Sequence, residues 1–148
     1  MADGRAPATT ALPIVPALPP QRLCAGDELV ERGRAIVFDV VHFHEPARAF
    51  ALRFDGRVVC YLNRCAHVPT ELDWQPGEFL DADKRWILCS IHGASYEPAD
   101  GRCVGGPCGR GRLAPIVTEE RDGQVYWYPS RDIQPVPFDA PPHESLFR

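Results

Sequence analysis

The chain has 148 residues, a length that fits a single domain. Acidic residues outnumber basic ones by 20 to 16, and the resulting net charge of −4 argues against a nucleic-acid partner. Apolar residues make up 45% of the sequence, enough for a modest core, but no apolar run reaches the length of a membrane span.

Proline is concentrated at both ends of the chain, and it can neither donate to a sheet interior nor continue a helix. We therefore expect an N-terminal tail over residues 1–22, a folded domain over 23–129 and a C-terminal tail over 130–148. The N-terminus lacks the basic and apolar stretches of a signal peptide, so we expect a cytoplasmic protein. Its six cysteines should then be thiols or metal ligands rather than disulfides.

Between the tails, β-branched and aromatic residues alternate in short runs, which indicates strands. Two of the expected turns, Asp55-Gly56 and Asp122-Gly123, carry the strongest short signal for a hairpin. The expected elements in chain order are a short helix over 26–33 and strands over 34–44, 48–54, 57–63, 84–90, 114–120 and 124–130. The predicted fold class is all-β and antiparallel.

Two short motifs follow predicted strands and combine thiols with imidazoles. The first is Cys65-x-His67, and after twenty-one further residues comes the second, Cys89-x-x-His92. Loops at the ends of strands commonly carry functional sites on a rigid scaffold. We therefore expect the two loops to form one four-ligand metal site.

The mixture of ligands within each loop indicates which metal suits the site. A structural zinc finger pairs cysteine with cysteine and histidine with histidine, usually with the histidines on a helix. If each loop instead spans two irons, its cysteine binds one iron and its histidine the other, which is the ligation of a Rieske [2Fe–2S] centre. A structural zinc site remains the alternative.

With these motifs the sequence resembles the Rieske iron–sulfur domains, and among them the small soluble Rieske-type ferredoxins. The resemblance implies an antiparallel β-sandwich or barrel base with a small cluster-binding β subdomain, at about residues 63–110, formed by two loops. It also implies one [2Fe–2S] cluster per chain, with Cys65, His67, Cys89 and His92 as ligands. Supporting positions around the cluster are then Gly93, Tyr96, Gly105, Gly106 and Pro107.

At other positions the sequence differs from the high-potential respiratory Rieske domains. Those domains carry a disulfide between the cluster loops, whereas this chain has Thr70 and Ile91 there, and Ala94 replaces a serine that donates to a bridging sulfide. Their potential-raising features are thus only partly present. We further expect Cys103 and Cys108 to be free thiols, and His42 and His44 to lie on an exposed polar strand face rather than to bind a metal.

The resemblance implies a one-electron carrier, most like the ferredoxin component of an oxygenase system, without catalytic activity of its own. Its partners would be a flavin reductase and a terminal oxidoreductase or oxygenase, with no role for nucleic acid or a membrane. One alternative is a Rieske-type accessory subunit of a larger redox enzyme such as nitrite reductase. The other is a cluster-based redox sensor or a zinc-binding module.

Overall fold

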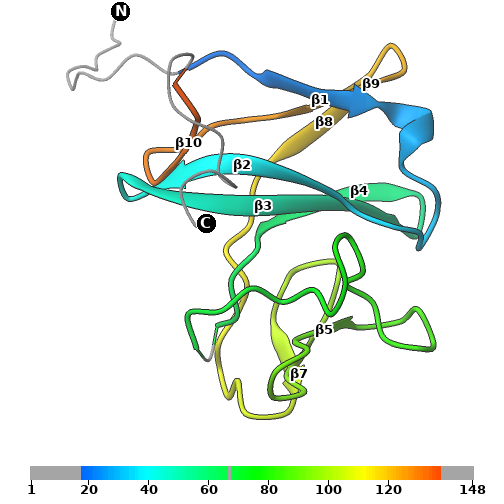
Figure 1. Cartoon of the computed structure of the whole chain (residues 1–148). Helices are drawn as coiled ribbons and strands as arrows, with labels where there is room; N and C mark the ends of the chain where they lie inside the picture. Colours follow the sequence, from blue (N-terminus) through cyan, green and yellow to red (C-terminus); the bar gives the residue numbers. More distant parts are fainter. Residues whose placement is uncertain (1–17, 67, 138–148) are drawn as a thin grey trace, which may run out of the picture.

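A computed structural model describes residues 18–66 and 68–137, and within these ranges ten strands form three antiparallel sheets (Figure 1). The first sheet has the order β1-β9-β8, with β1 at Gln21–Ala25, β8 at Thr118–Arg121 and β9 at Gln124–Trp127. The second has the order β10-β2-β3-β4, with β2 at Ile36–His42, β3 at Glu45–Phe54, β4 at Arg57–Leu62 and β10 at Ile133–Pro135. The third, β5-β6-β7, comprises Ile87–Leu88, Ser95–Tyr96 and Cys103–Gly105. The predicted all-β class is confirmed.

Both hairpins that the Asp-Gly pairs predicted are present. Asp55 and Gly56 have φ angles of 53° and 79° between β3 and β4, and Asp122 and Gly123 have 52° and 74° between β8 and β9. Two successive left-handed residues match the right-handed twist of the flanking strands, which is why this dipeptide forms tight hairpins.

Two other elements differ from the sequence prediction. The strand expected over 34–44 ends at His42, because Phe43 and His44 adopt left-handed φ angles of 48° and 68° and turn the chain into β3. His44 is therefore exposed in a turn rather than on a strand face. The expected helix over 26–33 is a single 3-10 turn at Gly26–Glu28, and the positive φ of 55° at Arg32 is incompatible with a longer helix.

Strands occupy part of both predicted tails. Gln21–Ala25 forms β1, and Ile133–Pro135 forms β10, which pairs with β2. Because β10 is at the edge of its sheet, Pro135 is tolerated there. Residues 1–17 and 138–148, which hold the rest of both predicted tails, lie outside the described residues.

The central strands β3 and β4 are buried on both faces and separate two cores. Along β3, Ala49 and Ala51 face the core of the two-sheet base, whereas Phe50, Leu52 and Phe54 face the other way. This second core continues into the segment around β5–β7, below β3 and β4 in Figure 1. Its other large members are Tyr61, Leu72, Phe79, Leu80, Ile87, Tyr96 and Leu113.

The contact between the base and the lower subdomain is aromatic. The rings of Phe50 and Phe79 stack with their centroids 3.7 Å apart. Tyr61 from β4 donates its hydroxyl to the carbonyl of Pro98 at 2.6 Å. The subdomain therefore rests on a rigid sheet. No helix in the described part of the chain is long and apolar enough to cross a membrane.

Candidate metal centre

The first predicted ligand loop leaves the end of β4 and turns sharply at Cys65. The Cys65 N–H donates to the Thr70 carbonyl at 2.8 Å, and the Cys65 side chain is buried at 5% exposure. His67, the second predicted ligand, lies outside the described residues.

Asn63, a buried polar residue that the sequence analysis missed, ties this loop together. Its Oδ1 accepts from the Leu72 N–H at 2.8 Å and its Nδ2 donates to Asp73 Oδ1 at 3.1 Å, so it joins the start and the end of the loop. A two-bond contact from Arg48 on β3 to Glu71, at 2.8 and 3.0 Å, fastens the loop to the base. The sequence does contain a signal for this role. Asn63 ends a predicted strand, and asparagine side chains commonly form hydrogen bonds with nearby backbone groups.

The second ligand loop connects β5 to β6 and closes on itself. The Cys89 N–H donates to the Ala94 carbonyl at 2.8 Å, and the Gly93 N–H donates to the Cys89 carbonyl at 2.9 Å. Gly93 has a φ of 74°, a conformation that glycine adopts without a steric penalty. As a result Cys89 is fully buried, whereas His92 is exposed at the tip of the loop.

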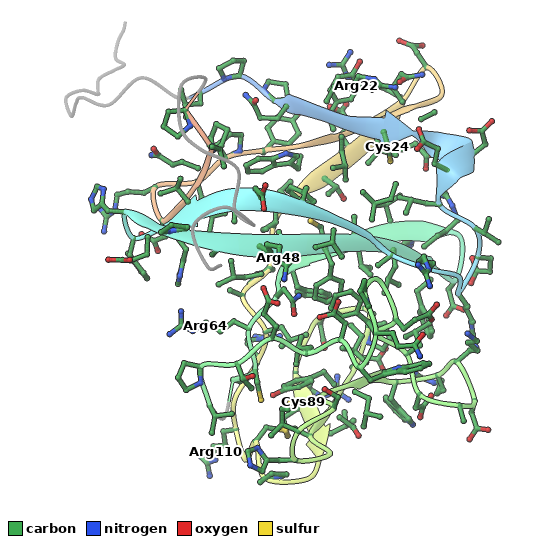
Figure 2. All side chains as sticks on the ribbon, viewed as in Figure 1. Arg22, Cys24, Arg48, Arg64, Cys89 and Arg110 are labelled. Atoms are coloured by element: carbon green, nitrogen blue, oxygen red, sulfur yellow. A yellow bond between two sulfur atoms is a disulfide. The ribbon has the colours of Figure 1, made fainter. Side chains whose placement is uncertain are left out.

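A hydrogen bond between backbones joins the two loops. The N–H of Ser90, directly after Cys89, donates to the Leu72 carbonyl at the end of the first loop, at 3.1 Å. The contact brings Cys65 and Cys89 into the same core, with Cys89 visible inside the lower subdomain in Figure 2.

Hydrogen-bond donors surround the two sulfurs. The Tyr96 hydroxyl lies 3.4 Å from Cys65 Sγ and accepts from the Ala66 N–H at 3.1 Å, which leaves its own proton for the sulfur. Burial raises the pKa of the Cys89 thiol, the backbone N–H groups of Ile91 and His92 lower it, and the neighbouring Cys65 raises it. Two buried, adjacent thiols thus need a cation to become thiolates together, and the site offers donors to the resulting charge.

The loop after β7 packs directly on the second ligand loop. Gly106 has a φ of 79°, and a Cβ atom built on it would lie 2.8 Å from both the Ala94 Cα and the Gly93 carbonyl oxygen. Such contacts with rigid backbone restrict this position to glycine. The neighbouring Gly105 has open space at the corresponding point, so the two predicted glycines differ in their structural role.

The expectation of free thiols at Cys103 and Cys108 is wrong, because a disulfide joins them. Their Cα atoms are 5.8 Å apart, within the ordinary range for a disulfide, since the glycine-containing loop reverses the chain between them. The prediction relied on the redox compartment and could not anticipate this turn. The remaining cysteines of the described residues, Cys24, Cys60, Cys65 and Cys89, are buried and are not joined by disulfides.

The predicted donor set combines two thiols with imidazoles. A cluster of two irons needs only two protein ligands on each iron. The predicted ligands Cys65 and Cys89 are buried in one core with hydrogen-bond donors near their sulfurs, and the predicted ligand His92 is exposed at the tip of its loop.

Comparison with known families decides the assignment. The sequence profile of the Rieske [2Fe–2S] domain matches residues 20–128, more than half of the chain. The chain belongs to the Rieske [2Fe–2S] domain family. This Rieske domain binds one [2Fe–2S] cluster, and all three described ligand candidates lie within the matched range. The comparison with curated proteins found no match.

Solved structures share its fold. It is similar to the ferredoxin of carbazole 1,9a-dioxygenase from Nocardioides aromaticivorans IC177, with a TM-score of 0.60 and 21% identity over 75% of this chain and 98% of that one. It is also similar to the terminal oxygenase of that system from the same organism, with a TM-score of 0.59 and 21% identity over 83% of this chain and 34% of that one. A third similar structure is the reduced complex between oxygenase and ferredoxin in carbazole 1,9a-dioxygenase. Its TM-score is 0.60, with 22% identity over 74% of this chain and 28% of that one. The chain thus spans about a third or less of these last two matched chains.

Proposed function

We propose that this Rieske domain is a one-electron carrier of the ferredoxin type, working between a flavin reductase and a terminal oxygenase. The main support is coverage, because the fold matches 98% of a ferredoxin chain and 34% of an oxygenase chain. The ferredoxin in that comparison is named as a component of a dioxygenase, and the likeness suggests an analogous role here. A cytoplasmic location is part of the same proposal.

The proposed ligands are Cys65 and Cys89 on one iron and His67 and His92 on the other. Burial of both cysteines and the donors near their sulfurs support the first pair. The exposure of His92 supports its place at the outer iron. When bound, the cluster supplies the reversible uptake of one electron, at a potential of about −150 to +300 mV for this ligand type.

The residues around the proposed cluster shield the two sulfurs from water and leave one predicted ligand accessible to a partner. Burial keeps water from the two sulfurs, and the Tyr96 hydroxyl and the backbone N–H groups of Ile91 and His92 stabilise negative charge on them. The imidazole of His92 is the part of the site that a partner protein can approach. A carrier needs only these features, because it transfers electrons without transforming a substrate.

A redox titration of the purified full-length protein tests the proposal. We expect one reversible one-electron couple per chain within about −150 to +300 mV, and reduction by NADH through a flavin-containing ferredoxin reductase supplied as the probe donor. A reversible couple that no such reductase can reach would contradict the carrier role while leaving the cluster assignment intact. A protein without any couple would contradict both.

A further inference from the structure

We propose that the exposed end of the cluster-binding subdomain docks on an acidic protein face. The proposal rests on the electron-carrier function and specifies the chemistry of the partner. The end in question, here called the cluster tip, comprises the described residues of the two ligand loops and of the loop that packs on them, 64–66, 68–70, 89–94 and 102–112. It contains four arginines, namely Arg64, Arg102, Arg110 and Arg112, and no aspartate or glutamate.

The charge of the tip is opposite to that of the remaining chain. The whole chain carries −4 and the cluster tip carries +4, so the remaining residues together carry −8. Of this charge, −5 belongs to the other residues of the same subdomain, 71–88 and 95–101, whereas the described residues of the two-sheet base, 18–63 and 113–137, carry −2. An acidic surface therefore attracts the tip and repels the carboxylates around it. Such an asymmetric field orients two proteins before they touch, and here the favoured orientation has His92 leading.

Two of the four arginines are free to meet a partner. Arg64 and Arg110 are exposed, and neither forms an ion pair with any residue in the described ranges. Figure 2 shows both at the edge of the subdomain. Arg102, by contrast, is paired with Asp100 at 2.9 Å, and Arg112 donates to the Asp100 carbonyl at 3.3 Å.

Apolar side chains accompany these charges. Ile91, directly before His92, is 57% exposed, Val104 is 38% exposed, and Pro107 is also exposed. Apolar groups at the centre and charged groups at the rim are the usual composition of a protein–protein contact. Because these apolar groups flank the predicted iron ligand, we infer that a partner covers this end of the molecule and brings its acceptor close to His92.

The first test measures the field at the tip with small redox ions. The reduced holoprotein is oxidised by the hexacyanoferrate(III) trianion, which takes one electron and becomes hexacyanoferrate(II), at salt concentrations between about 0.1 and 0.5 M. There the Debye length is about 10 Å or less, so the probe responds to nearby arginines rather than to distant carboxylates. We expect the rate to fall as salt is added, as it does for opposite charges, although the protein carries −4.

Matched arginine variants locate the effect. The double variant Arg64→Gln, Arg110→Gln should be oxidised by the anion about three- to tenfold more slowly at the lowest salt. Arg57→Gln removes another exposed arginine without an ion pair in the described ranges, at the far end of β4, and should leave the rate unchanged. All variants should retain wild-type cluster content and spectra, which separates a change of field from a loss of structure.

The second test replaces the ion with an acidic polymer. Poly-L-glutamate should protect the wild type from oxidation by hexacyanoferrate(III), and protect the double variant much less, whereas poly-L-lysine should protect neither. A rate that rises with salt, or equal protection of both proteins, would overturn the acidic-partner inference. Both measurements require an intact cluster, so such a result would contradict the acidic partner and not the carrier function.

Discussion

At the scale of single residues, the hydrogen bonds to the cysteine sulfurs set how easily the site accepts an electron. A donor to a thiolate disperses its negative charge and so favours the reduced state. Tyr96 supplies such a donor, 3.4 Å from Cys65 Sγ, while Ala94 has no hydroxyl to offer. We therefore expect the wild-type potential to lie in the lower or middle part of the Rieske range, about −150 to +300 mV.

Replacing Tyr96 with phenylalanine should lower the potential by tens of millivolts, up to roughly 100 mV, because a charge-assisted bond is lost and about 59 mV corresponds to a tenfold change. Voltammetry measures the shift. Tyr61→Phe is the matched control, since its hydroxyl donates to the Pro98 carbonyl, and its potential should stay near the wild-type value. Equal shifts in both variants would show that packing rather than the hydrogen bond is responsible.

The substitution Ala94→Ser should have the opposite effect. A hydroxyl at this fully buried position, within the second ligand loop, would add a donor and raise the potential by a similar amount. The same voltammetry, on protein with unchanged iron content, measures it. An unchanged or lower potential would mean that the new hydroxyl donates elsewhere.

At the scale of elements, the predictable features are those that depend on a few neighbouring residues. Asp55-Gly56 and Asp122-Gly123 carry their turn preference within two residues, so both hairpins were predictable. The turn at Phe43-His44 has neither glycine nor asparagine, and contacts outside the turn stabilise it: β2 pairs with β3, and the Phe43 N–H donates to the Asp132 carbonyl at 3.0 Å. The pairing of β10 with β2 was missed for a similar reason, because it depends on an edge that only the folded sheet provides.

The first ligand loop is held by Asn63, so truncating this side chain should loosen it. Asn63→Ala leaves the buried Leu72 N–H without its acceptor, which should cost about 1–3 kcal/mol of stability. We expect a lower thermal midpoint of the holoprotein and faster loss of the cluster colour on heating. The nearby exposed Gln75→Ala serves as the control. Similar losses for both variants would argue against a specific role for Asn63.

The disulfide between Cys103 and Cys108 should stabilise the loop that packs on the cluster loops. Closing so short a ring contributes about 2 kcal/mol in the chain-entropy description. The double variant Cys103→Ser, Cys108→Ser should therefore unfold at a lower temperature, and dithiothreitol should shift the wild type to the same midpoint without affecting the variant. Thiol titration of the unfolded apoprotein under non-reducing conditions should find four thiols, whereas six would refute the disulfide.

At the scale of the whole molecule, β3 and β4 contribute to two cores. One face packs inside the two-sheet base and the other supports the subdomain that carries the predicted ligands. The strand over 48–54 was predictable from the sequence, but which residue faces which core was not, because that depends on pairing register. The Cys and His spacing predicts four ligands, since each loop carries its own pair, and this ligand set stays a prediction. The basic cluster tip was not readable in the same way, because it arises only when three separate loops meet.

Electron paramagnetic resonance of the dithionite-reduced protein, with iron and acid-labile sulfide analysis on the same sample, tests the central claim most directly. The account predicts two irons and two sulfides per chain and an average g value below that of all-cysteine clusters, because two histidines ligate one iron. A colourless protein with one zinc and no labile sulfide would contradict it. So would a two-iron cluster whose average g value equals that of all-cysteine ligation.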